Sequence, residues 1–409
     1  MEPTGAVQGL RCPDCETIHP LDADQGCPTC GTACTVAYDY DAVNTAALFD
    51  RGAPPRDTDT TTGSQSARGQ WHYDGLLPFS AADAVTAGEG ATPLVAADRL
   101  SDELSVDSVY IKDESRNPTG TVYDRGMSVA ATAIAARAAP EAVEPAALAT
   151  TGNSGQSAMA YLRRLGVRSY AFVPSRSAFS NKAMINVHGG EMQVVGGRYS
   201  DAADAVDEQL AGDYYSLQEF TTPYRQEGAK TLAFELYADL GGVPDVIFVP
   251  ASTGEVVVGV AAGFEELVTI GVADETPTLV AVQPTGCAPI ATAVDSGASP
   301  PEPWAVPDTI VGELEVPDPA GGSQAVAALE ELDGAAVTVD DDEILESAVA
   351  VASNEVIEMG AAGGAAPAGA WRYADDGGFG GDETVVLLNT ESGTKTPDIL
   401  RSHLMGPGG

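Results

Sequence analysis

Basic residues are scarce in this chain of 409 residues, where 20 Lys+Arg stand against 60 Asp+Glu and the formal net charge is -40. Such a charge repels phosphate backbones and anionic lipid headgroups, so nucleic acid and membrane surfaces are excluded as principal partners. Dense carboxylates with few lysines are typical of proteins from concentrated salt, because carboxylates retain water and counter-ions there. We therefore expect a halophilic protein. The lysines are Lys112, Lys182, Lys230 and Lys395.

Long apolar runs are also missing. No run of about 18 apolar residues is present, and the N-terminus lacks the basic start and apolar stretch of a signal peptide. These absences predict a soluble, cytoplasmic protein. The hydrophobic content of 44% excludes a disordered acidic chain, and the length allows two or three domains with a buried active site.

Cysteine is rare outside the N-terminal segment, since five of the six cysteines lie between Cys12 and Cys34. Four of them form two CxxC knuckles, which aim two thiolates each at one point and together suit a closed tetrahedral Zn(II) site. A redox dithiol is the alternative. We expect a structural zinc ribbon over residues 1–38, with Cys34 and the distant Cys287 as buried thiols. The expected zinc ligands are Cys12, Cys15, Cys27 and Cys30.

The rest of the chain divides into a polar stretch and a long patterned body. Residues 39–70 are interrupted by Gly, Pro, Thr and Asp and read as a linker or arm. Residues 71–405 alternate apolar β-rich runs with Ala-rich helical segments, which predicts an α/β body with mostly parallel or mixed sheets flanked by helices. Its size favours two lobes, the small one over approximately residues 125–210. The expected strands include Val106–Ile111, Ser169–Val173, Met192–Val195, Asp245–Val249, Thr278–Val282 and Thr384–Leu388; the expected helices include Met127–Ala138, Gln156–Leu165, Lys182–His188, Lys230–Leu240, Val256–Leu267 and Glu343–Glu358.

Four motifs carry a resemblance to a known family. They are GEGATPL at 88–94, KDESRNPTGTVYDRG at 112–126, TGNSG at 151–155 and VQPTGCAPI at 282–290. In composition and order they resemble the threonine synthase family of tryptophan-synthase-β-like, fold type II pyridoxal-phosphate (PLP) enzymes. The resemblance implies a two-lobed α/β fold and PLP chemistry at the β and γ carbons of amino acids. Threonine synthases convert O-phosphohomoserine and water to threonine, and family members often form dimers.

The family's Schiff-base lysine is absent from the second motif. It normally follows Asn-Pro-Thr-Gly-Ser-Phe, and here Tyr123 stands in that place, ahead of Asp124. A phenol forms no imine, and with a pKa near 10 it is a weak acid or base at neutral pH. None of the four lysines replaces it in the sequence, although a replacement in space is invisible at this level.

The phosphate-binding turn departs from the family as well. Family members place a glycine-rich turn there, so that backbone N–H groups surround the phosphate at a helix N-terminus. In this chain Ser252, Thr253 and Gly254 remain as donors, and Glu255 directs a carboxylate towards a dianionic phosphate. The resemblance therefore implies PLP, while the residues at its two most demanding positions argue against it.

Other family positions are retained. By resemblance Asn153 meets the phenolic oxygen of PLP, although an asparagine here equally suits a helix cap. The C-terminal motif NTESGTK at 389–395 agrees with the family as well. Within it Ser392 or Thr394 resembles the hydroxyl residue that faces the pyridine nitrogen, and both also suit a plain turn. Cys287 matches a family cysteine beside the cleft, where a buried structural thiol is the simpler interpretation.

Two hypotheses follow. The first is a non-catalytic paralogue that binds an amino acid or a phosphorylated metabolite, or regulates an active paralogue as its partner. The second is a PLP-dependent lyase that uses a relocated lysine, or a cofactor-free reaction with Tyr123 as the acid. An aldimine spectrum and borohydride reduction distinguish them.

Overall fold

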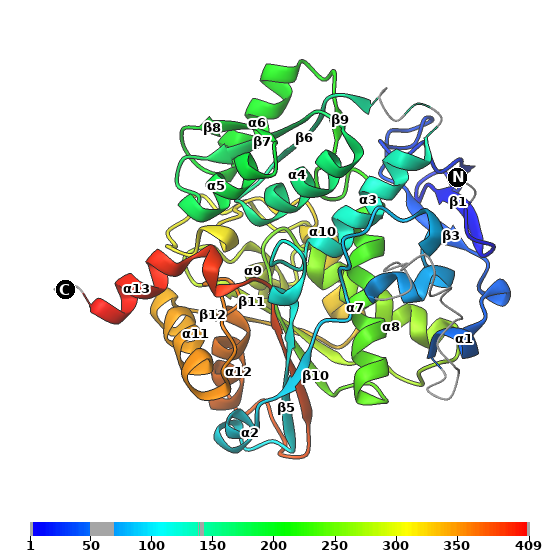
Figure 1. Cartoon of the computed structure of the whole chain (residues 1–409). Coiled ribbons are helices and arrows are strands. Elements are labelled where there is room, and N and C mark those ends of the chain that lie inside the picture. Colours follow the sequence, from blue (N-terminus) through cyan, green and yellow to red (C-terminus); the bar gives the residue numbers. More distant parts are fainter. Residues whose placement is uncertain (1–2, 50–68, 138, 140–142, 407–409) are drawn as a thin grey trace, which may run out of the picture.

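The computed structural model describes residues 3–49, 69–137, 139 and 143–406. In this part of the chain, three sheets form a small N-terminal module and two α/β lobes (Figure 1). No helix of the described residues is long and apolar enough to cross a lipid bilayer. The two-lobed α/β architecture predicted from the sequence is confirmed.

The N-terminal module is an antiparallel sheet in the order β2-β1-β3. It comprises β1 (Val7–Arg11), β2 (Ile18–His19) and β3 (Thr35–Tyr38). Its core is only a few side chains, among them the buried Leu10, Cys12, Cys27 and Cys34. A module this small gains little stability from apolar burial alone.

The chain after the module packs against the body. It forms a 3₁₀ turn (Tyr40–Ala42) and α1 (Thr45–Phe49), and a second 3₁₀ segment covers Gly69–Leu76. The Phe49 ring lies 5.6 Å from that of Tyr73 and 5.9 Å from that of Phe234. The centre of the predicted linker, residues 50–68, lies outside the described residues.

The small lobe holds a four-stranded parallel sheet in the order β8-β7-β6-β9. It is the upper, green part of Figure 1. Two of its strands were predicted within a few residues. Its elements are β6 (Ala146–Ala149), β7 (Ser169–Pro174), β8 (Glu191–Val195), β9 (Tyr215–Ser216), α3 (Asp124–Ala136), α4 (Asn153–Leu165), α5 (Phe179–Val187) and α6 (Tyr199–Leu210).

The large lobe is built on a six-stranded sheet in the order β12-β11-β10-β13-β5-β4, parallel except for β4. Successive residues point to opposite faces: Ile247 and Val249 join the core under α7, α8 and α10, and Phe248 joins the core under α11 and α12. Burial on both faces explains why these strands read as continuous apolar runs. The strands are β4 (Leu94–Ala96), β5 (Ser108–Asp113), β10 (Val246–Pro250), β11 (Thr278–Pro284), β12 (Ala335–Val339) and β13 (Thr384–Asn389).

Helices cover both faces of this sheet, and a further helix forms the C-terminal end of the described chain. The chain enters the large lobe through β4 and β5, crosses into the small lobe, and returns through α7 to β10. The carboxyl ends of strands from both lobes therefore carry the loops that contain the motifs. The helices are α2 (Asp98–Leu104), α7 (Tyr224–Leu240), α8 (Glu255–Thr269), α9 (Pro289–Ser296), α10 (Gly322–Glu331), α11 (Asp341–Glu355), α12 (Ala365–Asp375) and α13 (Pro397–Met405).

Candidate functional site

The motif loops that follow β5 and β13 are joined by backbone hydrogen bonds. Val122 N–H donates to the Thr390 carbonyl at 3.0 Å, and Ser392 N–H donates to the Gly120 carbonyl at 3.0 Å. The loops after β6 and β10 reach the same place through the side-chain contacts described below. Four segments far apart in the sequence thus meet at one place between the lobes, which we call the motif cleft.

A buried ionic framework of Lys112, Glu114, Arg125 and Glu235 lies behind this cleft. The Arg125 guanidinium contacts Glu114 Oε2 at 2.6 Å and Glu235 Oε2 at 2.7 Å. Lys112 Nζ lies 2.9 Å from Glu235 Oε2. Because each charge has a partner of opposite sign, the framework holds β5, α3 and α7 in fixed relation.

Tyr123 stands directly before α3, with its hydroxyl 3.3 Å from Ser252 Oγ after β10. The Arg225 guanidinium lies 5.8 Å from the centre of the Tyr123 ring. Burial, and after it the Glu255 carboxylate, raises the pKa of the Tyr123 phenol above its usual value. The phenol therefore stays protonated at neutral pH and acts as a hydrogen-bonding group.

Glu255, the first residue of α8, is buried and paired rather than free. Its Oε1 accepts a hydrogen bond from Arg225 Nε at 2.8 Å, and its Oε2 contacts the same guanidinium. Arg225 also contacts Glu219 Oε2 at 3.3 Å. Burial raises the pKa of Glu255, and Arg225 partly offsets the shift. Sequence reasoning missed Arg225 because it lies on α7, outside the motif that contains Glu255.

The remaining residues of the turn before α8 are tightly constrained. Thr253 is buried, and its Oγ1 has no hydrogen-bond partner among the described residues. Gly254 has φ of +89°, and a Cβ there would lie 2.8 Å from the Gly321 carbonyl oxygen. A glycine is required at this position for backbone reasons alone.

Asn153 is the first residue of α4, and its side chain is used for a contact across the cleft. Its Nδ2 donates a hydrogen bond to Oε2 of the buried Glu391. Glu391 Oε1 accepts from the Ala362 N–H at 3.1 Å. Glu391 lies in the C-terminal motif, and an acidic residue inside that motif was the available signal for it.

The predicted hydroxyl residues of the C-terminal motif lie in a surface turn. Thr394 is exposed, and its Oγ1 lies 2.9 Å from Ser392 Oγ. Ser392 Oγ also accepts from the Thr394 N–H at 3.3 Å. Both side chains therefore behave as turn residues here.

Three of the four lysines are unsuited to replace the family's amine. Lys112 belongs to the ionic framework, and Lys182 is half-buried with its Nζ donating to the Ser175 carbonyl at 2.8 Å. Lys230 lies on α7, where its ammonium group is paired with Glu227 and Glu266. Lys395 alone lies in the cleft, and burial lowers its pKa to about 8.

The four predicted zinc ligands come together. The Sγ atoms of Cys12, Cys15, Cys27 and Cys30 lie within 4.8 Å of one another, which suits tetrahedral ligation. His19 Nε2 lies 3.3 Å from Cys27 Sγ, a contact that the sequence did not predict. Cys34 and Cys287 are buried, as expected.

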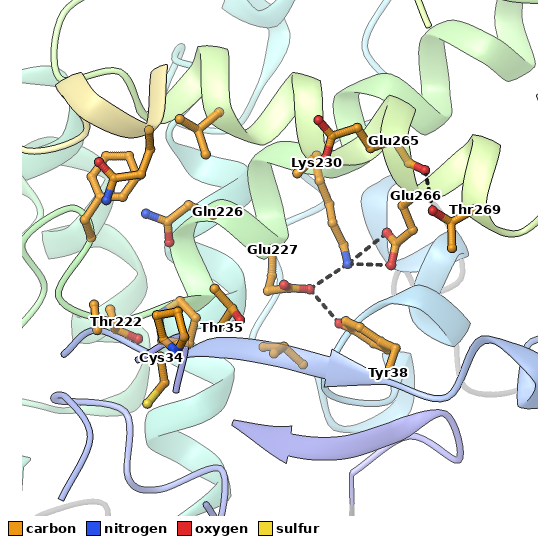
Figure 2. Close-up of a pocket in the computed structure, with 18 of the residues that line it drawn as sticks. Cys34, Thr35, Tyr38, Thr222, Gln226, Glu227, Lys230, Glu265, Glu266 and Thr269 are labelled. Carbon is orange, nitrogen blue, oxygen red and sulfur yellow. Dashed lines mark hydrogen bonds and ion pairs between the residues drawn. The ribbon is translucent and has the colours of Figure 1, made fainter. Parts of the chain in front are cut away.

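A cavity of about 560 Å³ separates this module from α7 and α8 (Figure 2). Lys230 Nζ lies 2.7 Å from Glu227 Oε2, 2.9 Å from Glu266 Oε2 and 4.3 Å from the centre of the Tyr38 ring. The Tyr38 hydroxyl donates to Glu227 Oε2 at 2.5 Å. This closed network ties β3 to α7, so the polar groups of the cavity hold the module in place.

Two smaller cavities of about 200 Å³ and 50 Å³ lie next to the motif cleft. Both are lined by Arg176, Ser177, Ile310 and Gly312. The larger of the two is also lined by Glu313 and Lys395.

Comparison with known proteins identifies the family. The family model described as pyridoxal-phosphate dependent enzyme matches residues 85–391. The chain belongs to this family. Its relatives include a threonine synthase of Methanosarcina acetivorans, 30% identical over 96% of this chain and 93% of the relative. A threonine synthase of Methanocaldococcus jannaschii is also 30% identical, over 95% of this chain and 93% of the relative.

Solved structures agree with this assignment at the level of the fold. Diaminopropionate ammonia lyase from Escherichia coli gives a TM-score of 0.67 at 18% identity, over 87% of this chain and 94% of that chain. Processed threonine deaminase isoform 2 from Solanum lycopersicum gives a TM-score of 0.65 at 21% identity, over 77% and 88%. The protein is a threonine synthase-like member of the family with the fold type II architecture.

The residues at three family positions for the cofactor do not fit PLP. The phosphate would meet the buried carboxylate of Glu255 at the start of α8, whose guanidinium partner already carries two carboxylates. The Asn153 amide expected to meet the ring donates to Glu391. Tyr123 supplies no amine. No step through PLP is therefore derived for this chain.

Proposed function

We propose that this protein is a non-catalytic, threonine synthase-like paralogue that binds a small metabolite without PLP, either on its own or as the regulatory partner of an active synthase. The Arg225–Glu255 pair carries the proposal. It supplies, from within the chain, the negative charge that a cofactor phosphate would bring to the start of α8. Two further contacts support it: Tyr123, in place of the family's lysine, meets Ser252, and Asn153, expected to meet the cofactor, donates to Glu391.

The chain's own groups would bind and orient a ligand rather than transform it. Tyr123 remains a neutral donor beside Ser252, and Asp124 accepts hydrogen bonds from Thr119 Oγ1 at 2.6 Å and Ser157 Oγ at 2.5 Å. The hydroxyl partner of Tyr123 is Ser252, which is not a base that would activate the phenol as a nucleophile. The cleft therefore offers fixed hydrogen-bonding groups and charge.

PLP titration of the purified protein tests the proposal. We expect no aldimine absorbance near neutral pH and no phosphopyridoxyl peptide after borohydride reduction. Tyr123→Lys alone should restore little, because Glu255 still faces the phosphate, and Tyr123→Lys with Glu255→Gly should restore more. Tyr214→Lys, on the turn before β9, controls for a lysine added elsewhere. Reduction of wild type that labels a lysine in the cleft, with turnover of O-phosphohomoserine, overturns the proposal.

A second candidate, a PLP-dependent lyase with a relocated lysine, is supported by one residue. Lys395 is buried in the cleft, and a Cβ on Gly120 would lie 3.5 Å from its Cε. Its lowered pKa suits an amine that attacks carbonyls. Peptide mapping that places phosphopyridoxyl on Lys395 would select this candidate.

The N-terminal cysteines support a structural zinc site, which we propose as a second part of the function. Metal analysis should give one zinc per chain, and the Cys15→Ser and Cys30→Ser variants should lose it, whereas Cys287→Ser should keep it. Hydrogen exchange should then rise in β1–β3 only. Less than half an equivalent of zinc in wild type prepared without chelator would contradict the site.

The acidic composition supports a further proposal, that the fold requires concentrated salt. A charge of -40 destabilises the compact state by self-repulsion unless counter-ions accumulate around it. The unfolding midpoint should rise between low and molar KCl. A flat or falling midpoint would contradict a halophilic protein.

A further inference from the structure

Five buried polar residues form a cluster at the small-lobe end of the cleft. This cleft cluster consists of Asn153, Asn181, Glu313, Glu391 and Lys395, each no more than 6% exposed. Asn181 packs against the loop before α4 so closely that a Cβ on Gly152 would lie 2.6 Å from its Nδ2. The cluster thus joins α4, α5, the 3₁₀ turn Gly312–Leu314 between α9 and α10, and the loop after β13.

Three acceptor atoms of the cleft cluster have no donor. They are Asn153 Oδ1, Asn181 Oδ1 and Glu313 Oε2, which lack a hydrogen-bond partner among the described residues. An unsatisfied buried polar atom costs about 1–3 kcal/mol. The two amide oxygens only accept, and the Glu313 oxygen accepts when its carboxyl group is ionised, so a donor is the group that satisfies all three.

The internal amine does not supply these hydrogen bonds. Lys395 Nζ donates to Gln156 Oε1 at 2.5 Å, and no carboxylate of the described residues forms an ion pair with it. Glu313 and Glu391 leave the cluster with more carboxylates than cations. Burial and the Glu391 carboxylate raise the pKa of Glu313 to about 8, so the Glu313 site gains from an added positive charge.

The same charges disfavour an anionic ligand. At the start of α8, where the family binds the cofactor phosphate, Glu219 and Glu255 already outnumber Arg225. A phosphate or a second carboxylate placed here would be desolvated beside charges of its own sign. A cofactor site that binds a phosphate and a phenolate needs positive charge or hydrogen-bond donors, whereas this site has an excess of carboxyl groups.

The cavity of about 200 Å³ limits the size of the ligand. Glu313, Lys395 and Arg176 line it, and the Arg176 side chain is 48% exposed with its Nη1 3.2 Å from Glu315 Oε2. Drug-sized ligands occupy about 300–1,000 Å³, so this space suits a smaller molecule. A half-exposed guanidinium at the same cavity suits one carboxylate of a zwitterion.

We propose that the cleft binds, non-covalently, a small zwitterion of α-amino acid size whose ammonium group faces Glu313, Asn181 and Asn153, and that it rejects the phosphorylated analogue. The inference rests on the proposed function, because a PLP aldehyde would capture the same amine. Of the two ligand classes considered for this cleft, amino acids and phosphorylated metabolites, the proposal favours the amino acids.

Calorimetric titration of the full-length, PLP-free protein at pH 7.5 and fixed KCl tests this proposal. The probes are the proteinogenic L-amino acids, L-homoserine, O-phospho-L-homoserine, and L-lactate as the counterpart of L-alanine without its ammonium. At least one amino acid should bind, and its hydroxy acid or phosphorylated counterpart should bind at least tenfold more weakly. Absence of binding by every amino acid, or tighter binding of a counterpart, overturns the proposal.

Two variants with effects of opposite sign connect the binding to the cluster. Glu313→Gln should lower the affinity for the amino acid at least tenfold. Lys395→Met should raise this affinity, because a competing positive charge is removed. Glu346→Gln, exposed on α11, should change nothing. An unchanged affinity in Glu313→Gln, or weaker binding in Lys395→Met, would contradict the assignment. Lys395→Met keeps the proposal testable if Glu313→Gln fails to fold.

The PLP spectrum of the same preparation distinguishes a failure of the proposed function from a failure of the ammonium site. An aldimine in wild type overturns the proposed function whatever the titration gives. A PLP-free protein that binds none of the amino acids leaves the proposed function intact and overturns the ammonium site alone.

Discussion

The ionic framework behind the cleft and the cleft cluster within it differ in how completely their buried charges are paired. In the framework each charged group has an opposite partner within 3 Å, as Arg125 has with Glu114 and Glu235. In the cleft cluster Lys395 has no carboxylate partner and three acceptors have no donor among the described residues. In a fully paired network the loss of one partner is strongly destabilising, whereas unsatisfied buried groups are retained at a cost and call for an explanation, which we propose is a ligand.

Removing the central ion of the framework should have the largest effect. Arg125→Met leaves Glu114 and Glu235 buried without their guanidinium, and we expect the free energy of unfolding to fall by about 3–5 kcal/mol. Denaturant unfolding at fixed KCl measures it. Arg99→Met is the control, because Arg99 pairs with Glu103 at the surface and should cost about 0.5 kcal/mol or less. Equal effects of the two variants would remove the contrast between framework and surface.

Glu313 should make stability depend on pH. Its folded pKa of about 8 lies above the ordinary value of 4.5, so the folded state holds a proton that the unfolded state releases. This contribution to stability is complete below about pH 4.5 and is lost as the pH rises through about 8. Glu313→Gln should therefore gain stability relative to wild type across this window in thermal unfolding. A constant difference between the two proteins would contradict the prediction.

Lys395 should show the opposite dependence. Burial lowers its pKa from 10.5 to about 8, so holding the charged form in the folded state destabilises the protein below about pH 8. Lys395→Met should be more stable than wild type by about 1–2 kcal/mol at pH 7, after the loss of the Gln156 hydrogen bond. The difference should disappear as the pH approaches 10.5. A less stable variant at pH 7 would place Lys395 with the paired ions.

The smallest effect is expected where the N-terminal module meets the body. Tyr38→Phe removes the hydrogen bond to Glu227 inside a closed network and should cost about 1 kcal/mol. Hydrogen exchange in β3 and in the first turns of α7 should rise. Tyr214→Phe removes a surface bond to Asp207 and serves as the control, with a smaller expected change. Identical exchange in both variants would show that the network does not tie the module to α7.

The sequence predicted the parts of the fold whose residues have a clear local preference. Apolar β-branched runs located the strands around Phe248 and Val280, because strands buried on both faces need such residues. The strand Ala146–Ala149 was missed, since alanine has no preference for strands. It forms because β7 and β9 flank it and helices cover it, which is a tertiary reason.

The candidate site was predictable to the same limited degree. The identity of Tyr123, Glu255 and the four CxxC cysteines follows directly from their motifs. The roles of Arg225, Asn181 and Glu313 did not, because each acts through a residue far away in the chain, as Arg225 acts through Glu255 across 30 positions. Thr394 shows the converse, since a motif position alone did not indicate that its side chain faces solvent.

By itself the sequence determined which chemical groups this protein possesses: thiols at zinc-site spacing, a phenol in place of the family's amine, and a carboxylate in its phosphate turn. These are properties of single residues, so they do not depend on how the chain folds. Only the tertiary structure decided which of the buried charges are paired: Glu255 meets Arg225 and Glu391 meets Asn153, while one Glu313 oxygen has no partner in the part of the chain that the structure describes. Pairing depends on distances of a few ångströms between distant parts of the chain, and in a desolvated cleft those distances determine which ligand the protein accepts.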